Sequence, residues 1–260
     1  DNRTGASAII GSEIVAKAAP DGYTLLLTFD PPHTTTPFIV RKVPYDIVKD
    51  FTPITMVVRA PQTLVISASV PASSLKEFIE YVKQNPGKVF YGTTGKGTAQ
   101  HFGGELLNQT VNIELVHVPY KGMQQVLTDV LAGRLQAAIA VLASAQPHMQ
   151  SGRLRALAVL ESSRAVAAPD LPTVAEAGVP GYTMPDTWIG FLGPSGLPHP
   201  IVSRIHAEVV KAADAPEVRA HFQSLGFGLI LNSPGEMAAA IAQSMQIYRK
   251  IATNANIQPE

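Results

Sequence analysis

The chain has 260 residues, of which 46% are hydrophobic and 15% charged, so it can bury a sizeable core and is not disordered. Its 20 lysines and arginines balance its 20 aspartates and glutamates, which argues against nucleic-acid binding, since such proteins carry a basic excess. The absence of cysteine excludes disulfides, thiol catalysis and cysteine-ligated zinc. No apolar stretch approaches the ~20 residues that a membrane-spanning helix needs.

Strands and helices alternate along much of the chain. The strands are expected at 23–29, 51–58, 63–70, 88–93, 114–120, 135–141, 154–160 and 227–231. From 74 to 160 the strands alternate with helical segments, a pattern that predicts a parallel sheet flanked by helices. The proline- and glycine-rich region 161–200 is expected to be an irregular excursion that ends in a crossing strand.

Two helix starts carry capping residues. At the start of the helix 74–83, Ser74 and Glu77 have the spacing of a capping box. The apolar residues of this helix recur at i, i+3, i+4 and i+7, as Leu75, Phe78, Ile79 and Val82. Near the end of the chain, Ser233 and Glu236 flank a Pro-Gly pair and begin a long helix with one apolar face.

Residues 89–102, VFYGTTGKGTAQHF, place a glycine-rich loop between an expected strand and an expected helix. The P-loop motif fails twice, because Phe90 stands where its first glycine is required and Gly97 where a serine or threonine is required. The dinucleotide-binding fingerprint fails at Gln100, which stands where its third glycine is required. A nucleotide site is therefore not predicted.

The same loop can still hold an anion. Gly95 and Gly97 let backbone N–H groups turn towards a ligand, and Thr98 begins a helix whose N-terminus attracts carboxylates. In the alternative interpretation, the loop is a tight strand-to-helix turn whose glycines serve only its geometry.

Catalytic and metal-binding motifs are scarce. The seven histidines show neither HExxH nor HxxxH spacing, and GPSG at 193–196 is not a nucleophile elbow. His33 and His101 each follow the end of a strand, the position where α/β sheets bind ligands, but a structural hydrogen-bonding role explains each equally well. His117 lies within a strand and is expected to be a core or edge residue.

Several characteristic stretches occur in order over nearly the whole chain. They read DNRTGA, AAPDGYTLL, VPYDIVKDFTPIT, VPASSLKEFIEYVKQNPGKVFYGTTGKGT, VHVPYKG, LTDVLAGRLQ, PHMQSGRLRALAV, LPTVAEAGVPGY and EVVKAADAPEVR. Together they resemble the periplasmic solute receptors of tripartite tricarboxylate transporters, the Bug family.

The resemblance implies a two-domain α/β periplasmic binding protein of the Venus-flytrap type. Its parallel-rich sheets would be flanked by helices, and two strands would cross between the domains, near 63–69 and 186–192. The first domain would comprise 1–66 and 190–260, and the second 67–189. Family members carry a further strand, glycine-rich loop and helix before DNRTGA. Either this chain lacks them, and with them a strand of the first domain and one wall of its site, or the segment exists outside this sequence.

The resemblance also implies a receptor and not an enzyme. The ligand would be a small organic carboxylate or dicarboxylate, or an amino acid, delivered to integral-membrane transporter subunits in the periplasm of a Gram-negative bacterium. We expect a monomer that binds no cofactor, metal or nucleic acid. The alternatives are an enzyme acting on a small carboxylate, since fold alone does not set function, and a ligand-sensing domain of a regulator, although no helix-turn-helix accompanies this chain.

The resemblance assigns a set of ligand-binding residues on both sides of an interdomain cleft. They are Phe29, Asp30, His33, Thr93, Thr94, Gly95, Gly97, Thr98, His101 and Ala140. Two of them depart from the family pattern: Asp30 stands where small hydroxyl residues are usual, and Ala140 where an aspartate is common. If Asp30 faces the ligand, it favours a molecule with a donor end, such as an amine or a hydroxyl, opposite its carboxylate. The alternative is that Asp30 caps its own turn through backbone hydrogen bonds.

Overall fold

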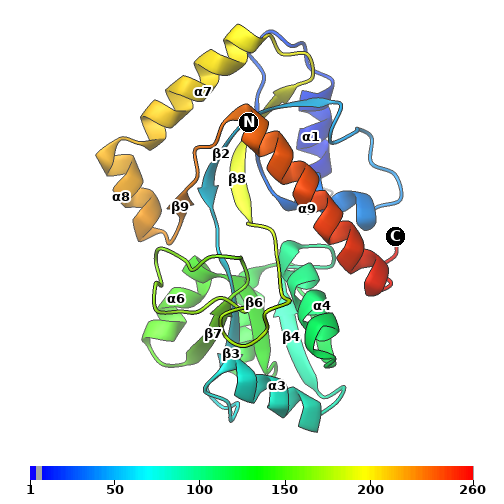
Figure 1. Cartoon of the computed structure of the whole chain (residues 1–260), viewed down its shortest axis with the longest axis vertical. Helices are drawn as coiled ribbons and strands as arrows, with labels where there is room; N and C mark the ends of the chain where they lie inside the picture. Colours follow the sequence, from blue (N-terminus) through cyan, green and yellow to red (C-terminus); the bar gives the residue numbers. More distant parts are fainter. Residues whose placement is uncertain (4–7, 260) are drawn as a thin grey trace.

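The computed structural model describes residues 1–3 and 8–259, so part of the DNRTGA stretch lies outside the described residues. Two sheets, each with its own helices, form the two halves of the molecule (Figure 1). We call the half around the sheet with strand order β1-β8-β2-β9 the first lobe, and the half around β5-β4-β6-β3-β7 the second lobe.

The first lobe is built from both ends of the described chain. Its strands are β1 (Leu26–Phe29), β2 (Phe51–Arg59), β8 (Trp188–Pro194) and β9 (Gly228–Leu229). Its helices are α1 (Ile9–Ala16), α2 (Pro31–Thr34), the short 3₁₀ helix η2 (Thr36–Phe38), α7 (His199–Ala213), α8 (Pro216–Ser224) and α9 (Pro234–Asn254). The described strand pairs in this sheet are all antiparallel, so the expectation of parallel-rich sheets is wrong for the first lobe.

The second lobe comes from the middle of the chain. Its strands are β3 (Gln62–Ser67), β4 (Val89–Thr93), β5 (Leu115–Pro119), β6 (Ala137–Val141) and β7 (Leu154–Val159). Its helices are α3 (Leu75–Gln84), α4 (Ala99–Val111), α5 (Met123–Leu131) and α6 (Leu142–Gln150). These elements follow the alternation predicted for 74–160.

The second sheet is mixed, whereas the alternation predicted a parallel one. Strand β4 pairs in parallel with β5 and β6, as predicted, but β3 pairs antiparallel with both β6 and β7. The reason is connectivity. Parallel neighbours need a helical crossover, whereas β3 enters directly from β2 of the other sheet and fills the position between β6 and β7.

The predicted helix starts are confirmed. The Ser74 hydroxyl accepts a hydrogen bond from the Glu77 N–H at 3.2 Å, and the apolar face of α3 is buried. The Glu77 carboxylate turns instead to the N–H and hydroxyl of Ser73, both at 2.6 Å. Ser233 and Glu236 form a complete capping box at the start of α9, which stabilises the end of this long helix.

Two chain segments connect the lobes side by side. Strand pairing changes from the first to the second sheet between Arg59 and Gln62, earlier than the expected crossing at 63–69. The returning segment runs alongside, and the Ala60 N–H donates to the Thr187 carbonyl at 2.8 Å. An ion pair of 2.6 Å between Arg59 and Asp186 joins the two segments again.

Helix α9 makes a third connection between the lobes. Its first half contributes Met237 and Ile241 to the apolar core of the first lobe. Its last turns bury Tyr248, Ile251 and Ala252 in the core of the second lobe, and Figure 1 shows this end lying beside α4. One helix thus packs into both cores.

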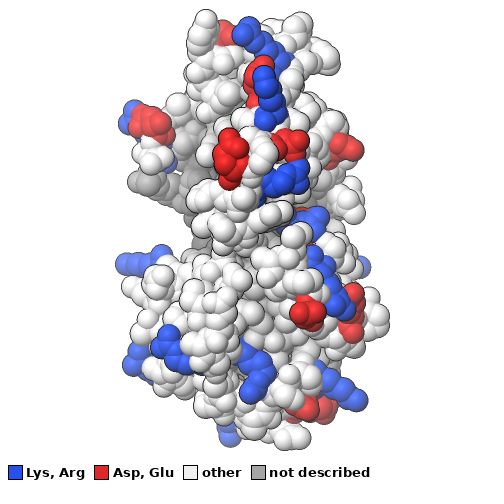
Figure 2. All heavy atoms as spheres, turned by 90° about the vertical axis from the view of Figure 1, so that its left-hand side faces the viewer, with Lys and Arg blue, Asp and Glu red and all other residues white. Residues whose placement is uncertain are grey.

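The surface of the described residues carries both signs of charge on both lobes (Figure 2). On the face shown, lysines and arginines do not gather into a single stripe, in keeping with the balanced composition. Among the described residues, no helix combines the length and the apolar character that spanning a bilayer would require.

Candidate functional site

A glycine-containing loop joins β4 to α4 in the second lobe. Thr98 is the N-cap of α4: its hydroxyl accepts a hydrogen bond from the His101 N–H at 3.3 Å and donates one to the Gly95 carbonyl at 2.9 Å. Gly95 and Gly97 have φ angles of 139° and 74°, which side-chain-bearing residues rarely adopt, so both glycines are needed for the turn. Helix α4 has 13 residues, and its N-terminus carries a partial positive charge.

The glycine N–H groups of this loop have partners within the protein. The Gly95 N–H donates to the Thr93 hydroxyl at 3.2 Å, and the Gly97 N–H donates to Nδ1 of His101, also at 3.2 Å. A carboxylate would therefore have to compete with these contacts, and the predicted turn of both amides towards a ligand stays a prediction. N–H groups in the first turn of α4 lack intrahelical partners, which makes this end suitable for an anion.

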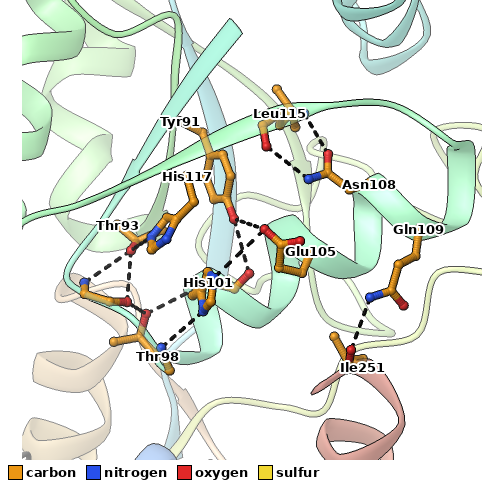
Figure 3. Close-up of polar contacts among 12 residues, drawn as sticks. Tyr91, Thr93, Thr98, His101, Glu105, Asn108, Gln109, Leu115, His117 and Ile251 are labelled. Carbon is orange, nitrogen blue, oxygen red and sulfur yellow. Dashed lines mark hydrogen bonds and ion pairs between the residues drawn. The ribbon is translucent and has the colours of Figure 1, made fainter. Parts of the chain in front are cut away.

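Two stacked imidazoles support the loop from behind (Figure 3). The ring centroids of His101 and His117 lie 4.1 Å apart, and Nε2 of His117 lies 2.7 Å from the Thr93 hydroxyl. Burial, together with the charge of Lys96, lowers the pKa of His101 to about 4. Burial, then the neighbouring His101 and Lys96, lowers the pKa of His117 to about 3. Both rings are neutral near neutral pH, and the proton of His101 sits on Nε2 because Nδ1 accepts from Gly97.

Two residues that hold the loop were not among the predicted site residues. Oε1 of Gln100 accepts hydrogen bonds from the N–H and the hydroxyl of Thr94, at 2.9 and 2.8 Å. His117 lies opposite Tyr91 in the middle of β4, and its ring reaches the Thr93 hydroxyl at the end of that strand. Alternation along 114–120 could have indicated the face of His117, whereas Gln100 gave no signal beyond its place in the first turn of a helix.

The first lobe contacts the loop directly. The Thr35 hydroxyl, just after α2, donates to the Gly97 carbonyl at 2.7 Å. The Ile39 side chain covers the same glycine so closely that a Cβ on Gly97 would lie 2.1 Å from its Cδ1. The loop therefore lies where the two lobes meet.

Asp30 is completely buried in the first lobe. Its carboxyl group accepts from the Thr34 hydroxyl and from the Tyr248 hydroxyl, each at 3.0 Å. Burial raises the pKa of Asp30 to about 7, against the lowering effect of these hydrogen bonds. The interpretation that Asp30 caps its turn is wrong, because no backbone N–H of the turn donates to its side chain. Direct ligand contact would require these surrounding side chains to open.

The other two predicted residues of the first lobe lie in contrasting places. His33 is completely buried, with Nε2 3.1 Å from the Thr28 hydroxyl and its ring packed edge-on against Phe51. Burial lowers the pKa of His33 to about 4, so this ring is a neutral core residue. Phe29 is 45% exposed at the end of β1.

Ala140 lies apart from the loop. It pairs with Thr63 in the centre of the second sheet and is completely buried. Its side chain belongs to the core cluster on the α5 and α6 face, which contains Val65 and Val126. The structure thus brings six of the predicted residues together: Thr93, Thr94, Gly95, Gly97, Thr98 and His101.

A cavity of about 550 Å³ adjoins the loop between the lobes. The second lobe lines it with Lys96, Gly97, His101 and Glu105, and Ile39 of the first lobe and the chain just after α9 complete the lining. Figure 3 shows Glu105 and His101 side by side on α4. Among the described residues, no three histidine, aspartate or glutamate side chains are grouped to hold a metal ion.

The sequence of this chain is similar to those of known proteins. The profile of the family described as "Tripartite tricarboxylate transporter family receptor" matches residues 1–257. A UPF0065 protein from the tcbD-tcbE intergenic region of Pseudomonas sp. strain P51 is 34% identical over 252 residues, which are 96% of this chain and 74% of that protein. Protein BugT of Bordetella pertussis is 31% identical over 246 residues, covering 94% of this chain and 75% of that protein.

Solved structures show the same fold. The R. palustris protein Rpa4515 with adipate superposes with a TM-score of 0.88 at 33% identity, covering 100% of this chain and 87% of that chain. MatC from Rhodopseudomonas palustris with bound malate gives a TM-score of 0.80 at 28% identity, covering 95% and 85%. The two-domain α/β fold of periplasmic binding proteins is thereby confirmed.

Proposed function

The chain belongs to the receptor family of tripartite tricarboxylate transporters, and from that membership we propose that it binds a small dicarboxylate between its lobes, at the loop Thr93–Thr98. The two R. palustris proteins were solved with adipate and with malate, both of which are dicarboxylates. A solute receptor of this family needs no catalytic residues, so we infer that the chain binds its ligand without turnover. We further infer that it works as a monomer in the periplasm of a Gram-negative bacterium, with integral-membrane transporter subunits as partners.

The observation that carries this proposal is the position of the loop. It combines the N-terminus of α4 with the exposed Lys96, two features that attract an anion. The first lobe touches the loop through Thr35, so a ligand held here can contact both lobes. The neutral His101 and His117 add no charge of their own and keep the loop in shape.

The domains that move would divide where the chain changes sheet. Strand pairing supports limits between Arg59 and Gln62 and just before Trp188, close to the limits predicted at 66/67 and 189/190. Closure of the two lobes on a ligand would then bend these two segments, as in hinged binding proteins.

The test is to replace Thr98 and measure dicarboxylate binding by calorimetry. In Thr98→Ala, adipate and malate should bind about 1–3 kcal/mol more weakly, since the loop loses the hydroxyl that holds the Gly95 carbonyl in place. Thr110→Ala is the matched control, because Thr110 lies on the same helix but bonds only to the Leu106 carbonyl, away from the loop. Equal affinities of the two variants would contradict the site.

Ligand class is tested with the wild-type chain. We expect the dicarboxylates to compete with one another and plain amino acids to compete poorly, because Asp30, the residue that could favour an amine, is buried. Mass spectrometry of a ligand that co-purifies with the protein would identify the molecule. Formation of any product from adipate or malate would overturn the receptor proposal in favour of the enzyme alternative.

A further inference from the structure

We propose that Gln62 and Gln100 are positioning residues that couple the crossing between the lobes to the geometry of the ligand loop. The proposal rests on the proposed function, because it takes the loop Thr93–Thr98 to be the place where the ligand binds. Neither glutamine is part of the loop, and both side chains are buried, with exposed fractions of 4% and 6%.

The first step is the anchoring of Gln62 at the crossing. Gln62 is the first residue of β3, where the chain has just left the first lobe. Its N–H is held by both carboxylate oxygens of the buried Glu161, at 2.9 and 3.1 Å. Its side-chain amide donates to the Ala60 carbonyl at 3.1 Å, and Ala60 is itself bonded to Thr187 of the returning segment. Gln62 is thus attached to both connecting segments.

The second step runs from Gln62 to the loop. Nε2 of Gln100 donates to Oε1 of Gln62 at 3.2 Å. Oε1 of Gln100 accepts from both the N–H and the hydroxyl of Thr94, at 2.9 and 2.8 Å. Only this orientation of the Gln100 amide satisfies Thr94, because a flipped amide would present a donor to the Thr94 N–H. The two glutamines therefore form one directional chain of hydrogen bonds from crossing to loop.

This series of hydrogen bonds makes the crossing between the lobes and the ligand loop depend on each other. A buried amide that loses its partner is left unsatisfied, which is costly, so Gln62 cannot shift without drawing Gln100 with it or breaking the chain. Bending of the crossing during lobe closure would then act on Thr94, the residue that enters the glycine turn. In this way the position of the lobes is expected to set the direction of the Thr94 N–H and hydroxyl.

Hydrogen exchange of the Thr94 amide tests the coupling without any ligand. In Gln62→Met, which keeps the side-chain volume but removes its polar end, the Thr94 N–H should exchange roughly threefold to tenfold faster, the equivalent of one neutral hydrogen bond. Gln136→Met is the matched control: Gln136 also accepts from a backbone N–H in this sheet, that of Phe90, but lies outside the chain of hydrogen bonds. The control should leave Thr94 exchange unchanged.

A double variant separates coupling from general loosening. If Gln62 acts through Gln100, the pair Gln62→Met and Gln100→Met should exchange at Thr94 no faster than Gln100→Met alone. Additive effects, or a wild-type Thr94 rate in Gln62→Met, would overturn the proposal. If Gln62→Met does not fold, Gln62→Asn, whose shorter side chain cannot reach Gln100, takes its place with the same expected result.

Binding of adipate supplies the second measurement. Gln62→Met should weaken adipate binding while Gln136→Met does not, although neither residue lines the loop. If the Gln62→Met variant binds adipate normally although its Thr94 amide exchanges faster, the role of Gln62 in binding is overturned. If adipate and malate bind to neither the variants nor the wild type, the proposed ligand is wrong, while the exchange result still decides the coupling.

Discussion

The two lobes each present a loop that follows a strand and enters a helix, yet the loops are built in opposite ways. In the first lobe, Asp30 and His33 turn inward and are completely buried among core side chains. In the second lobe, Thr94 and Gly95 stay partly exposed, and side chains behind the loop hold it in shape. The comparison teaches that polar residues after a strand end can serve either the core or the surface.

The largest effect should come from adding one methyl group to the second-lobe loop. Gly97→Ala places a Cβ 2.1 Å from Cδ1 of Ile39, on a residue whose φ is 74°. We expect a loss of unfolding free energy of about 2–5 kcal/mol, combining backbone strain and overpacking. Gly152→Ala is the matched control, since Gly152 has a φ of 69° but no atom within 4 Å of its added Cβ.

Chemical denaturation of both alanine variants measures the difference. The strain of the left-handed backbone is common to both, so the difference between them isolates the contact with the first lobe. If the two variants lose the same free energy, Ile39 moves away freely, and the lobes are not held together at the loop.

The next effect concerns the pH dependence set by the first-lobe loop. Burial raises the pKa of Asp30 from 3.8 to about 7 in the folded state, so the folded protein holds this proton more tightly than the unfolded chain. The stability contributed by Asp30 is therefore fully present below about pH 4 and is lost as pH rises through about 7. Asp30→Asn cannot titrate, so its stability should fall less between those limits, by up to a few kcal/mol.

Melting curves across this pH range, for the wild type and Asp30→Asn, measure that slope. Glu161 is also buried, and its pKa is raised to about 8, but it titrates in both proteins and cancels in the comparison. Parallel pH profiles would show that Asp30 is not the titrating group and that the first-lobe loop is more open than its burial indicates.

The smallest effect is spectroscopic. Trp188, the only tryptophan, is 1% exposed at the crossing, and its carbonyl accepts from the Asp30 N–H at 3.0 Å. If the lobes close on adipate, the surroundings of its indole should change, and a shift of fluorescence should follow adipate binding measured by calorimetry. If adipate saturates the protein and the spectrum does not change, the connecting segments bend away from Trp188. The first-lobe loop beside Trp188 would then keep its structure when the ligand binds.

Local signals in the sequence predicted most of the secondary structure, because a helix face or a cap depends on near neighbours. The apolar stripe of α3, the capping residues Ser74 and Ser233 and the glycine turn before α4 are examples. The site was less predictable. The partner of Asp30, Tyr248, lies 218 residues away, and no local pattern announces such a contact.

The same limit explains the errors in topology and in the site. The place of β3 along the chain does not reveal that it lies between β6 and β7 in the sheet. That position exists because β6 and β7, which α6 connects, are not neighbours in the sheet. The hydrogen bond between Gln62 and Gln100 joins two elements 38 residues apart and needs both to be packed before it exists. Long-range packing, which periodicity does not record, determined these features.

Helix α9 is expected to restrict the movement of the two lobes about the segments that connect them. Two strands alone would let the lobes swing widely, but the last turns of α9 are fastened into the second lobe by Tyr248, whose ring meets Phe102 edge-on at 5.1 Å, and by Ile251. If the lobes open far enough, these turns must separate from the core of the second lobe. Their apolar side chains then become exposed to water, which costs free energy in proportion to the apolar area exposed. We therefore expect the packing of the last turns of α9 to limit how far the two lobes can open.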